Sequence, residues 1–543
     1  MPATSPNDGR ALAPSPRRRG AIAVGTALLV SLACLSAATV ARLEDTAEDR
    51  WRRLTRRYWE DTYLAIGHRL SGRFPVAYRA VQGFSGPRGR GFEEVRPTLT
   101  SAATTAAIPS WRFWETLPLE IFRRPRPIPI FPRYDDAGRP LLLSFGFRLL
   151  GGVSPFLLFW IGLLAAAPVL AWMGWELSAA GATSAAATLL ILIGLCPFVA
   201  DVLASPYSAL GFYLVALFAL LALASYTALA PSPTARGVMA RTLAAGLVLA
   251  ICSACRASGL ALLPGFLLAV GIGAYRAAAA GGSTGRPRRV LLVALLGAAA
   301  VLIPAAGVSR AIQGLIARTL ADRSRPVDVP PPVHPFWHGI WIGLGDFDRS
   351  KGYVWNDQAA FDAIVRAGGT PSTTTYYDPA NERIARNLIL RDVASDPAWM
   401  AGIMIKRTAA TLTQWKLRPW AALSGQSIAP ATAPNEGQID SYYTLATPVD
   451  QFGIGGRNLE LPIPVLVAPA LFLAAAAVRA RRRRHPDLPL ERRLGVLACA
   501  AVATIAHPVL LTTASALETE AFALTYVVGA AFFVERMASR NSS

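Results

Sequence analysis

Acidic side chains gather directly after the first long apolar run of the chain. Glu44 and Asp45 follow that run, and Glu48 and Asp49 come one helical turn later. A carboxylate in this place could take a proton from an acceptor hydroxyl or hold a divalent metal ion. The alternative is a polar collar that ends a membrane helix, and the spacing alone favours neither interpretation.

Isolated charged residues lie near the ends of later apolar runs. Arg256, in CRASGLALLP, carries a planar guanidinium that could bind a phosphate oxygen, or it could reach lipid headgroups. Asp201, in CPFVADVLASPYSAL, could contact a substrate, cap the following helix or pair with Arg256. Arg310 ends another apolar run and is a second candidate for phosphate binding.

Aromatic rings and histidines cluster in HPFWHGIWIGLGDFD. Aromatic rings beside carboxylates suit sugar binding, because a pyranose has an apolar face and hydroxyl edges; the candidate residues are His334, Trp337, His338 and Asp346. Two histidines four residues apart could also share a helical face and bind a metal, although Pro335 between them argues against a regular helix. An interfacial aromatic belt is the alternative.

The elements that must position these residues are apolar helices. The chain has 543 residues, of which 53% are hydrophobic and only 16% charged, whereas soluble chains carry about 25% charged residues. Runs long enough to cross a bilayer lie at about 20–42, 147–173, 183–203, 207–230, 238–255, 258–275, 289–310, 462–480, 493–513 and 519–536. The sequence therefore predicts an all-α integral membrane protein with about ten transmembrane helices.

Basic residues predict the orientation of these helices. With Arg17–Arg19 inside, the short basic connections near Arg236, near Arg286 and at 479–486 (RARRRRHP) all fall on the cytoplasmic side, as does the carboxyl end. The net charge of +20 is spread over helix ends and loops and forms no single stripe, so no nucleic acid partner is expected. We expect a multi-pass membrane protein with both termini in the cytoplasm.

The apolar runs and the basic connections together divide the chain into six parts. They are a cytoplasmic basic tail (1–19), a first transmembrane helix (20–42), an extracytoplasmic loop with interfacial helices (43–146), a six-helix transmembrane bundle (147–310), a second extracytoplasmic segment (311–461), and three transmembrane helices with a cytoplasmic tail (462–543). In the second segment, residues 379–416 predict one or two helices, with a break near Asp396-Pro397.

The layout resembles the GT-C superfamily of polytopic membrane glycosyltransferases that use polyprenyl-phosphate sugars, in an uncharacterised bacterial branch. Such enzymes are similar in having a first helix, a long outer loop that opens with an acidic residue, a helical bundle and a later exported segment. Glu44-Asp45 falls at the place of that acidic motif. HPFWHGIWIGLGDFDRSKGYVWND and DPAWMAGIMIKRTAAT look like stretches that recur in bacterial membrane proteins of this type.

The resemblance implies an inverting transfer of a hexose or pentose from a lipid phosphate carrier. Asp45 or Glu44 would be the catalytic base and Arg256 a ligand of the donor phosphate. The acceptor would be an envelope glycan, lipid or protein. No cofactor is fixed, and a divalent ion, Mg²⁺ or Mn²⁺, stays an open alternative because Glu-Asp replaces an Asp-x-Asp pair. A transporter or flippase of lipid-linked glycans and a non-catalytic envelope scaffold are the rival functions.

Overall fold

The computed structural model describes a large part of the chain, and nearly all of that part is helical. The described residues are 20–37, 138, 141–142, 144–145, 157–196, 199, 203, 209–280, 286–320, 336–345, 349–354, 357–370, 379–413, 452–454, 457–459, 490–510 and 523–541. The helices of the bundle are the first helix (Gly20–Ala37), α8 (Leu157–Ala179), α9 (Thr183–Leu195), α11 (Ala209–Leu229), α12 (Ala235–Cys255), the 3-10 helix η1 (Ala257–Leu262), α13 (Leu263–Ala280), α14 (Arg286–Leu320), α21 (Leu490–Leu510) and α23 (Ala523–Asn541).

Six helices of the described part are long and apolar enough to cross a membrane. They cover Gly20–Ala37, Ile161–Ala179, Gly211–Leu229, Ala235–Cys255, Gly259–Ala280 and Pro287–Ile316. The prediction of a multi-pass helical membrane protein is therefore confirmed. The predicted span at 462–480 lies outside the described residues, and the total of ten stays a prediction.

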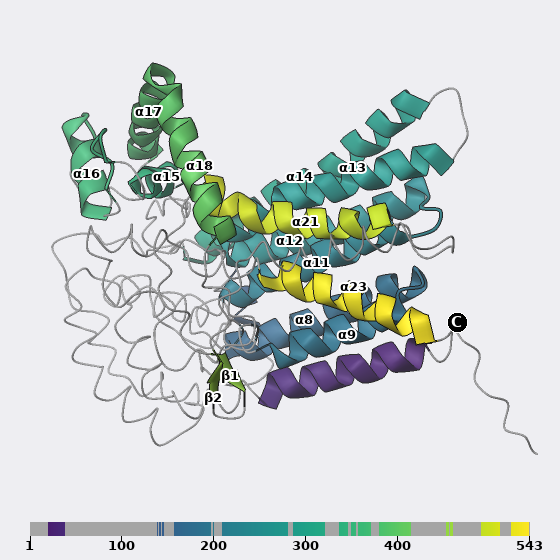
Figure 1. Ribbon diagram of the computed structural model, residues 1–543. Coiled ribbons are helices and arrows are strands. Elements are labelled where there is room, and N and C mark those ends of the chain that lie inside the picture. Colours follow the sequence, from purple (N-terminus) through teal and green to yellow (C-terminus); the bar gives the residue numbers. More distant parts are fainter. Residues whose placement is uncertain are drawn as a thin grey trace, which may run out of the picture.

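Helix α11 is the centre of the bundle. Its side chains from Phe212 to Ala224 are all buried, as expected for a helix that is apolar all round. Helices α8, α12, α13 and α21 pack around it, and Figure 1 shows these helices running roughly side by side. The uniform burial explains why this run carries no polar stripe.

The outer faces of the bundle are apolar too. Leu29 on the first helix, Leu164 on α8, and Leu291, Leu295 and Ile303 on α14 are all exposed. A soluble protein rarely leaves so much apolar surface open to water. Lipid tails are as apolar as leucine and satisfy this surface, so these faces belong against the bilayer.

Close helix packing depends on glycine at two crossings. A Cβ on Gly246 of α12 would lie 2.5 Å from the carbonyl oxygen of Ala300 in α14. A Cβ on Gly265 of α13 would lie 2.6 Å from the carbonyl oxygen of Cys499 in α21. Small residues let membrane helices approach at such crossings, and a larger residue would push these pairs apart.

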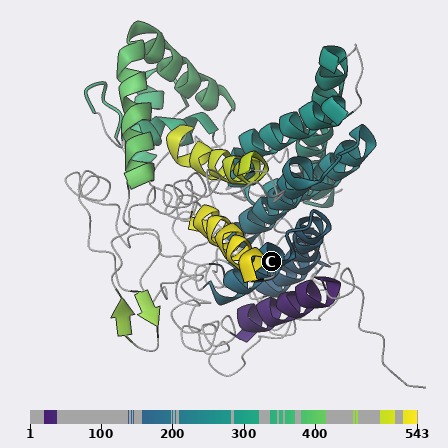
Figure 2. The ribbon, with the colours of Figure 1, turned by 45° about the vertical axis from the view of Figure 1, so that its right-hand side comes forward.

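A helical subdomain packs at one end of the bundle. It consists of α15 (Phe336–Leu344), α16 (Asp357–Arg366), α17 (Pro379–Ser395) and α18 (Pro397–Thr413), around a core that includes Trp341, Tyr353 and Trp399. Figures 1 and 2 show it in green beside one end of α21, and Figure 1 shows the carboxyl end of α23 at the far side of the bundle. We refer to these two ends as the subdomain end and the opposite end.

The predicted break near Asp396-Pro397 is confirmed. Helix α17 ends at Ser395, and α18 begins at Pro397, a residue that suits the first position of a helix. The Asp396 carboxylate caps α18 by accepting a hydrogen bond of 3.0 Å from the backbone N–H of Trp399.

Further along the chain, the short strands β1 (Phe452–Ile454) and β2 (Arg457–Leu459) pair antiparallel, with Gly453 opposite Asn458.

Candidate functional site

Three helix ends that precede candidate residues lie at the subdomain end of the bundle. The first helix ends at Ala37 and leads to Glu44 and Asp45, α9 ends at Leu195 and leads to Asp201, and α12 ends at Cys255 and leads to Arg256. Glu44, Asp45, Asp201, His334 and Asp346 themselves lie outside the described residues. Of the predicted site residues, the structure describes Arg256, Arg310, Trp337 and His338.

Contacts at the opposite end fix the direction of these helices. A Cβ on Gly20, the first residue of the first helix, would lie 3.3 Å from the Thr183 hydroxyl at the start of α9. Glu176, in the last turn of α8, lies close to the start of α9 and pairs with Arg241 near the start of α12. The first helix, α9 and α12 therefore all start at the opposite end and run towards the subdomain end.

Arg256 lies where α12 gives way to η1. Its backbone N–H donates to the carbonyl of Cys252 over 2.9 Å, and its own carbonyl accepts from Gly259 over 2.9 Å. The residue has an extended backbone (φ −152°, ψ 108°), so the chain turns sharply here. Its side chain is half-buried, with the Nε atom shielded from solvent. Because η1 packs against α11, α12, α13 and α21, the turn is held rigidly in the bundle.

The end of the first long segment packs directly on this turn. A Cβ on Gly138 would lie 2.8 Å from the carbonyl carbon of Ala254 and 2.8 Å from the Cys255 Sγ. Leu142, close behind it, packs against the core of the bundle. Thus a residue preceding the predicted 147–173 run touches the residues just before Arg256. Sequence reasoning missed this contact, because nothing in the sequence pairs a loop glycine with a distant helix end.

Arg310 lies inside α14, which continues to Leu320. The helix has 35 residues, so it is about 50 Å long, whereas the hydrocarbon core of a bilayer is about 30 Å thick. The apolar run ends at residue 310, but the helix does not. The Arg310 side chain is exposed.

Trp337 and His338 belong to the first turn of α15. The Glu382 carboxylate of α17 accepts hydrogen bonds from the backbone N–H groups of Trp337 (2.8 Å) and His338 (3.1 Å), and so caps the helix from outside. The His338 ring is buried and stacks on Phe361 with ring centres 4.9 Å apart. His338 is therefore a core residue of the subdomain, while Trp337 is half-buried. Within the described part of the chain, no group of three or more His, Cys, Asp or Glu side chains could hold a metal ion.

Polar contacts that the sequence did not predict organise the subdomain core. The Tyr353 hydroxyl donates to Asp392 over 3.0 Å, and its ring stacks on Trp399. Burial raises the pKa of Tyr353, and the bond to Asp392 raises it further. Lys351 lies 3.6 Å from the carboxylate of Asp396 and 5.2 Å from the centre of the Trp399 ring. The sequence around Lys351 and around Asp396 gives no sign that these two residues pair.

Arg407 joins the subdomain to the bundle. It projects from α18, is fully buried, and donates from Nη1 to the carbonyl of Val509 over 3.3 Å. Val509 is in the last turn of α21, where carbonyl groups have no partner within the helix and where a cation is favourable. This contact fixes α18 against the subdomain end of α21.

Fold and contacts together define a class: a multi-pass helical membrane protein with a small helical subdomain fixed to one end of its bundle. Neither known protein families, nor curated proteins, nor solved structures give a match for the chain.

Proposed function

We propose that the chain is a membrane glycosyltransferase of the GT-C type. It transfers a sugar from a polyprenyl-phosphate donor to a cell-envelope acceptor at the subdomain end, which faces away from the cytoplasm. One observation carries the proposal: the helix ends that lead to Glu44-Asp45 and Asp201 lie at the same end of the bundle as the Arg256 turn.

The chemistry needs a base and a positive charge. Asp45 or Glu44 takes the proton of an acceptor hydroxyl as its oxygen attacks the anomeric carbon of the donor sugar, and the bond between that carbon and the phosphate oxygen breaks. The departing phosphate gains negative charge, which the Arg256 guanidinium stabilises. Arg256 suits this role because the rigid η1 turn holds it in place, so little reorganisation is needed.

The subdomain offers an aromatic surface for the acceptor. Phe336 is exposed and Trp337 half-buried, and their rings meet edge to face with centres 5.4 Å apart. Exposed ring faces of this kind suit the apolar face of a sugar. Because Arg407 holds α18 against α21, the subdomain stays at the end of the bundle where the donor phosphate would lie.

The orientation in the membrane follows from charge. Arg236 and Arg241 near the start of α12, and Arg286, Arg288 and Arg289 at the start of α14, belong to helix starts at the opposite end. Short basic connections stay in the cytoplasm. The opposite end is therefore proposed as cytoplasmic, in the bacterial cytoplasmic membrane.

A flippase for lipid-linked glycans is the second candidate, because the bundle contains a buried carboxylate, Glu176, paired with the half-buried Arg241. Charged groups inside a bundle often mark a transport path. A flippase would use that pair and would leave no sugar transferred.

The test is complementation of a deletion strain, with profiling of its lipid-linked sugars and envelope glycans. The double change Glu44→Gln with Asp45→Asn, and separately Arg256→Gln, should leave the donor lipid accumulated and the product sugar missing. Arg383→Gln, a change at an exposed position of α17, is the matched control and should restore the normal profile. A normal profile from the acidic double variant, at equal protein level, would reject the proposed chemistry.

A further inference from the structure

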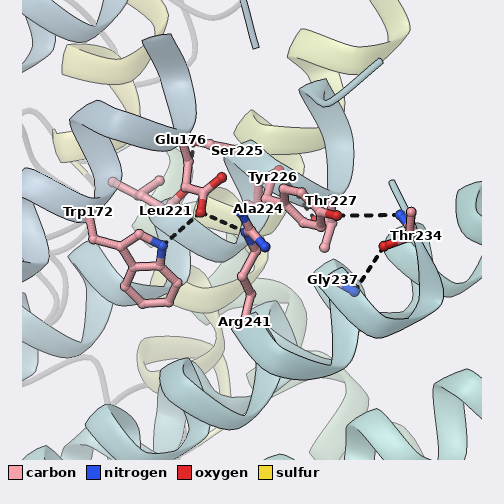
Figure 3. A network of polar contacts seen from close by, with 10 residues as sticks. All are labelled: Trp172, Glu176, Leu221, Ala224, Ser225, Tyr226, Thr227, Thr234, Gly237 and Arg241. Atoms are coloured by element: carbon pink, nitrogen blue, oxygen red, sulfur yellow. Dashed lines mark hydrogen bonds and ion pairs between the residues drawn. The ribbon is translucent and has the colours of Figure 1, made fainter. Parts of the chain in front are cut away.

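Charged and aromatic side chains tie helices together at the opposite end of the bundle (Figure 3). Glu176 of α8 is 4% exposed and accepts a hydrogen bond of 2.6 Å from the Nε of Arg241 in α12. The same carboxylate oxygen accepts from the indole N–H of Trp172 over 2.9 Å. The Arg241 guanidinium also lies 3.7 Å from the centre of the Tyr226 ring of α11. One arginine thus binds two neighbouring helices.

A second arginine ties the end of α11 to α13. Arg276 donates from its two terminal nitrogens to the carbonyls of Thr227 (2.8 Å) and Ala230 (2.6 Å). These carbonyls end α11 and would otherwise lack partners. We refer to Glu176, Arg241, Tyr226 and Arg276 as the clasp, which connects α8, α11, α12 and α13. Beside it, Arg493 of α21 lies 3.8 Å from Glu535 of α23.

The clasp lies next to a small apolar hollow inside the bundle. The hollow holds about 10 Å³ between α8, α9, α11, α21 and α23, and Leu177, Leu189, Leu221, Ser225 and Val528 are among its lining residues. This is room for about one water molecule. Leu177 directly follows Glu176, and Ser225 directly precedes Tyr226. Two of the helices that line the hollow, α8 and α11, therefore also carry residues of the clasp.

Opening the opposite end would separate these partners. Glu176 is almost wholly buried, and a buried carboxylate that loses its cationic partner is strongly destabilised. Arg241 would lose the ion pair and the ring contact together, and Arg276 would expose two helix-end carbonyls.

We infer that the clasp keeps the opposite end of the bundle closed, so that substrates enter and leave at the subdomain end alone. This goes beyond the proposed sugar transfer and holds whatever the reaction is. It separates the chain from an alternating-access transporter, which must open both ends in turn. The basic residue Arg241, which the sequence marks as a signal of orientation, acts here as a bond between helices.

Thiol labelling tests the inference without any assay of transfer. In a chain with its five cysteines replaced, Ser225→Cys places one thiol in the hollow, and Arg236→Cys places one at an exposed position of the opposite end. In membranes permeabilised so that both faces are reachable, a charged methanethiosulfonate reagent should modify the position 236 thiol rapidly and leave the position 225 thiol unmodified. Adding Glu176→Gln should speed labelling at position 225 at least about tenfold, because the clasp then opens more often. Equal labelling rates at 225 and 236 in the unaltered clasp would overturn the inference.

A cross-link keeps the test decisive if Glu176→Gln fails to fold. A Cβ on Gly273 of α13 would lie 3.1 Å from the Thr227 Cβ of α11, so Thr227→Cys with Gly273→Cys can form a disulfide after a small shift. A disulfide at a cytoplasmic end would not persist in the living cell, so the variant is oxidised in membranes isolated from the complemented deletion strain. These membranes should form the missing envelope product as fast as the same membranes after reduction. Loss of product formation on oxidation, with recovery on reduction, would show that the opposite end must open and would also overturn the inference. Because labelling involves no sugar, its outcome is independent of the proposed transferase activity.

Discussion

Lys406 and Arg407 are neighbours on α18, yet their surroundings differ completely. Lys406 is exposed, while Arg407 is fully buried and bonded to the last turn of α21. A charged side chain is accepted in such a place only when its hydrogen-bonding groups are used. The pair therefore offers a matched comparison of a solvated and a structural cation on one helix.

Replacing Arg407 by Ala should destabilise the protein strongly. The change leaves a cavity and an unsatisfied Val509 carbonyl, and the loss should be about 2–4 kcal/mol. Lys406→Ala should stay within about 0.5 kcal/mol of the parent. Thermal unfolding in detergent, followed by circular dichroism, measures both. Equal unfolding temperatures for the two variants would contradict the role given to Arg407.

Tyr353 should resist ionisation in the folded protein. Its pKa is raised by burial and by Asp392, so the unfolded chain releases this proton at lower pH than the folded chain. Between the unfolded pKa, about 10, and the higher folded one, folding stability should fall as pH rises. Below about pH 10 this group adds no pH dependence.

The measurement is a difference titration of phenolate absorbance between the parent and Tyr353→Phe. For the folded proteins, the absorbance difference between parent and variant should show no phenolate appearing near pH 10. For the denatured proteins, the same difference should show one tyrosine ionising there. A full phenolate signal near pH 10 in the native difference would mean that Tyr353 is open to water.

Residue-scale prediction from sequence succeeded where the cause is local. The break at Asp396-Pro397 follows from proline geometry and a capping carboxylate, and both act within one turn. It missed what depends on a distant partner. Neither the burial of His338 against Phe361 nor its backbone bond to Glu382 was expected, and its role in substrate binding stays a prediction. The role of Arg407 depends on Val509, about a hundred residues away, and α18 alone gives no sign of it.

At the scale of elements, helix α13 provides its own control for packing. A Cβ on Gly265 would lie 2.5 Å from the Ala503 Cβ and 2.6 Å from the Cys499 carbonyl oxygen, whereas Gly271 on the same helix has nothing within 4 Å of its added Cβ. Gly265→Ala should therefore cost about 1–3 kcal/mol through overpacking against α21. Gly271→Ala should be neutral or stabilising by up to about 1 kcal/mol, because alanine favours the helix.

Thermal unfolding of the two alanine variants in the same detergent measures this difference. Gly265→Ala should unfold at a lower temperature than the parent, and Gly271→Ala at the same or a higher one. The reverse order would contradict the α13–α21 packing.

Helix boundaries show what hydropathy can and cannot predict. Runs of apolar residues located α11 and α12 to within three residues at each end, because these segments are predominantly apolar, and the run at 258–275 covers most of η1 and α13. The run at 289–310 placed α14 but missed its continuation to Leu320. Hydropathy reports apolar side chains, and α14 continues past residue 310 through polar positions such as Gln313 and Arg318.

At the scale of the whole molecule, the two ends of the bundle differ. The opposite end carries the clasp and the starts of the basic helices α12 and α14, and the subdomain end carries α15–α18 and the Arg256 turn. Short basic connections alternate with long segments along the sequence, and this pattern predicted that the two ends of the bundle differ. It could not predict how they are built, because the Arg407 bridge and the Gly138 contact join segments whose separation in the sequence has no pattern.

The proposed sugar transfer requires residues 45 and 256 to lie on the same side of the membrane, the side away from the cytoplasm. In a cysteine-free chain, Asp45→Cys and Arg256→Cys are each labelled in intact spheroplasts with a membrane-impermeant maleimide, with Arg236→Cys as the reference for the opposite end. We predict that the thiols at 45 and 256 react in intact spheroplasts and that the thiol at 236 reacts only after the membrane is opened. Labelling of 45 and 256 from contrary sides would contradict the account.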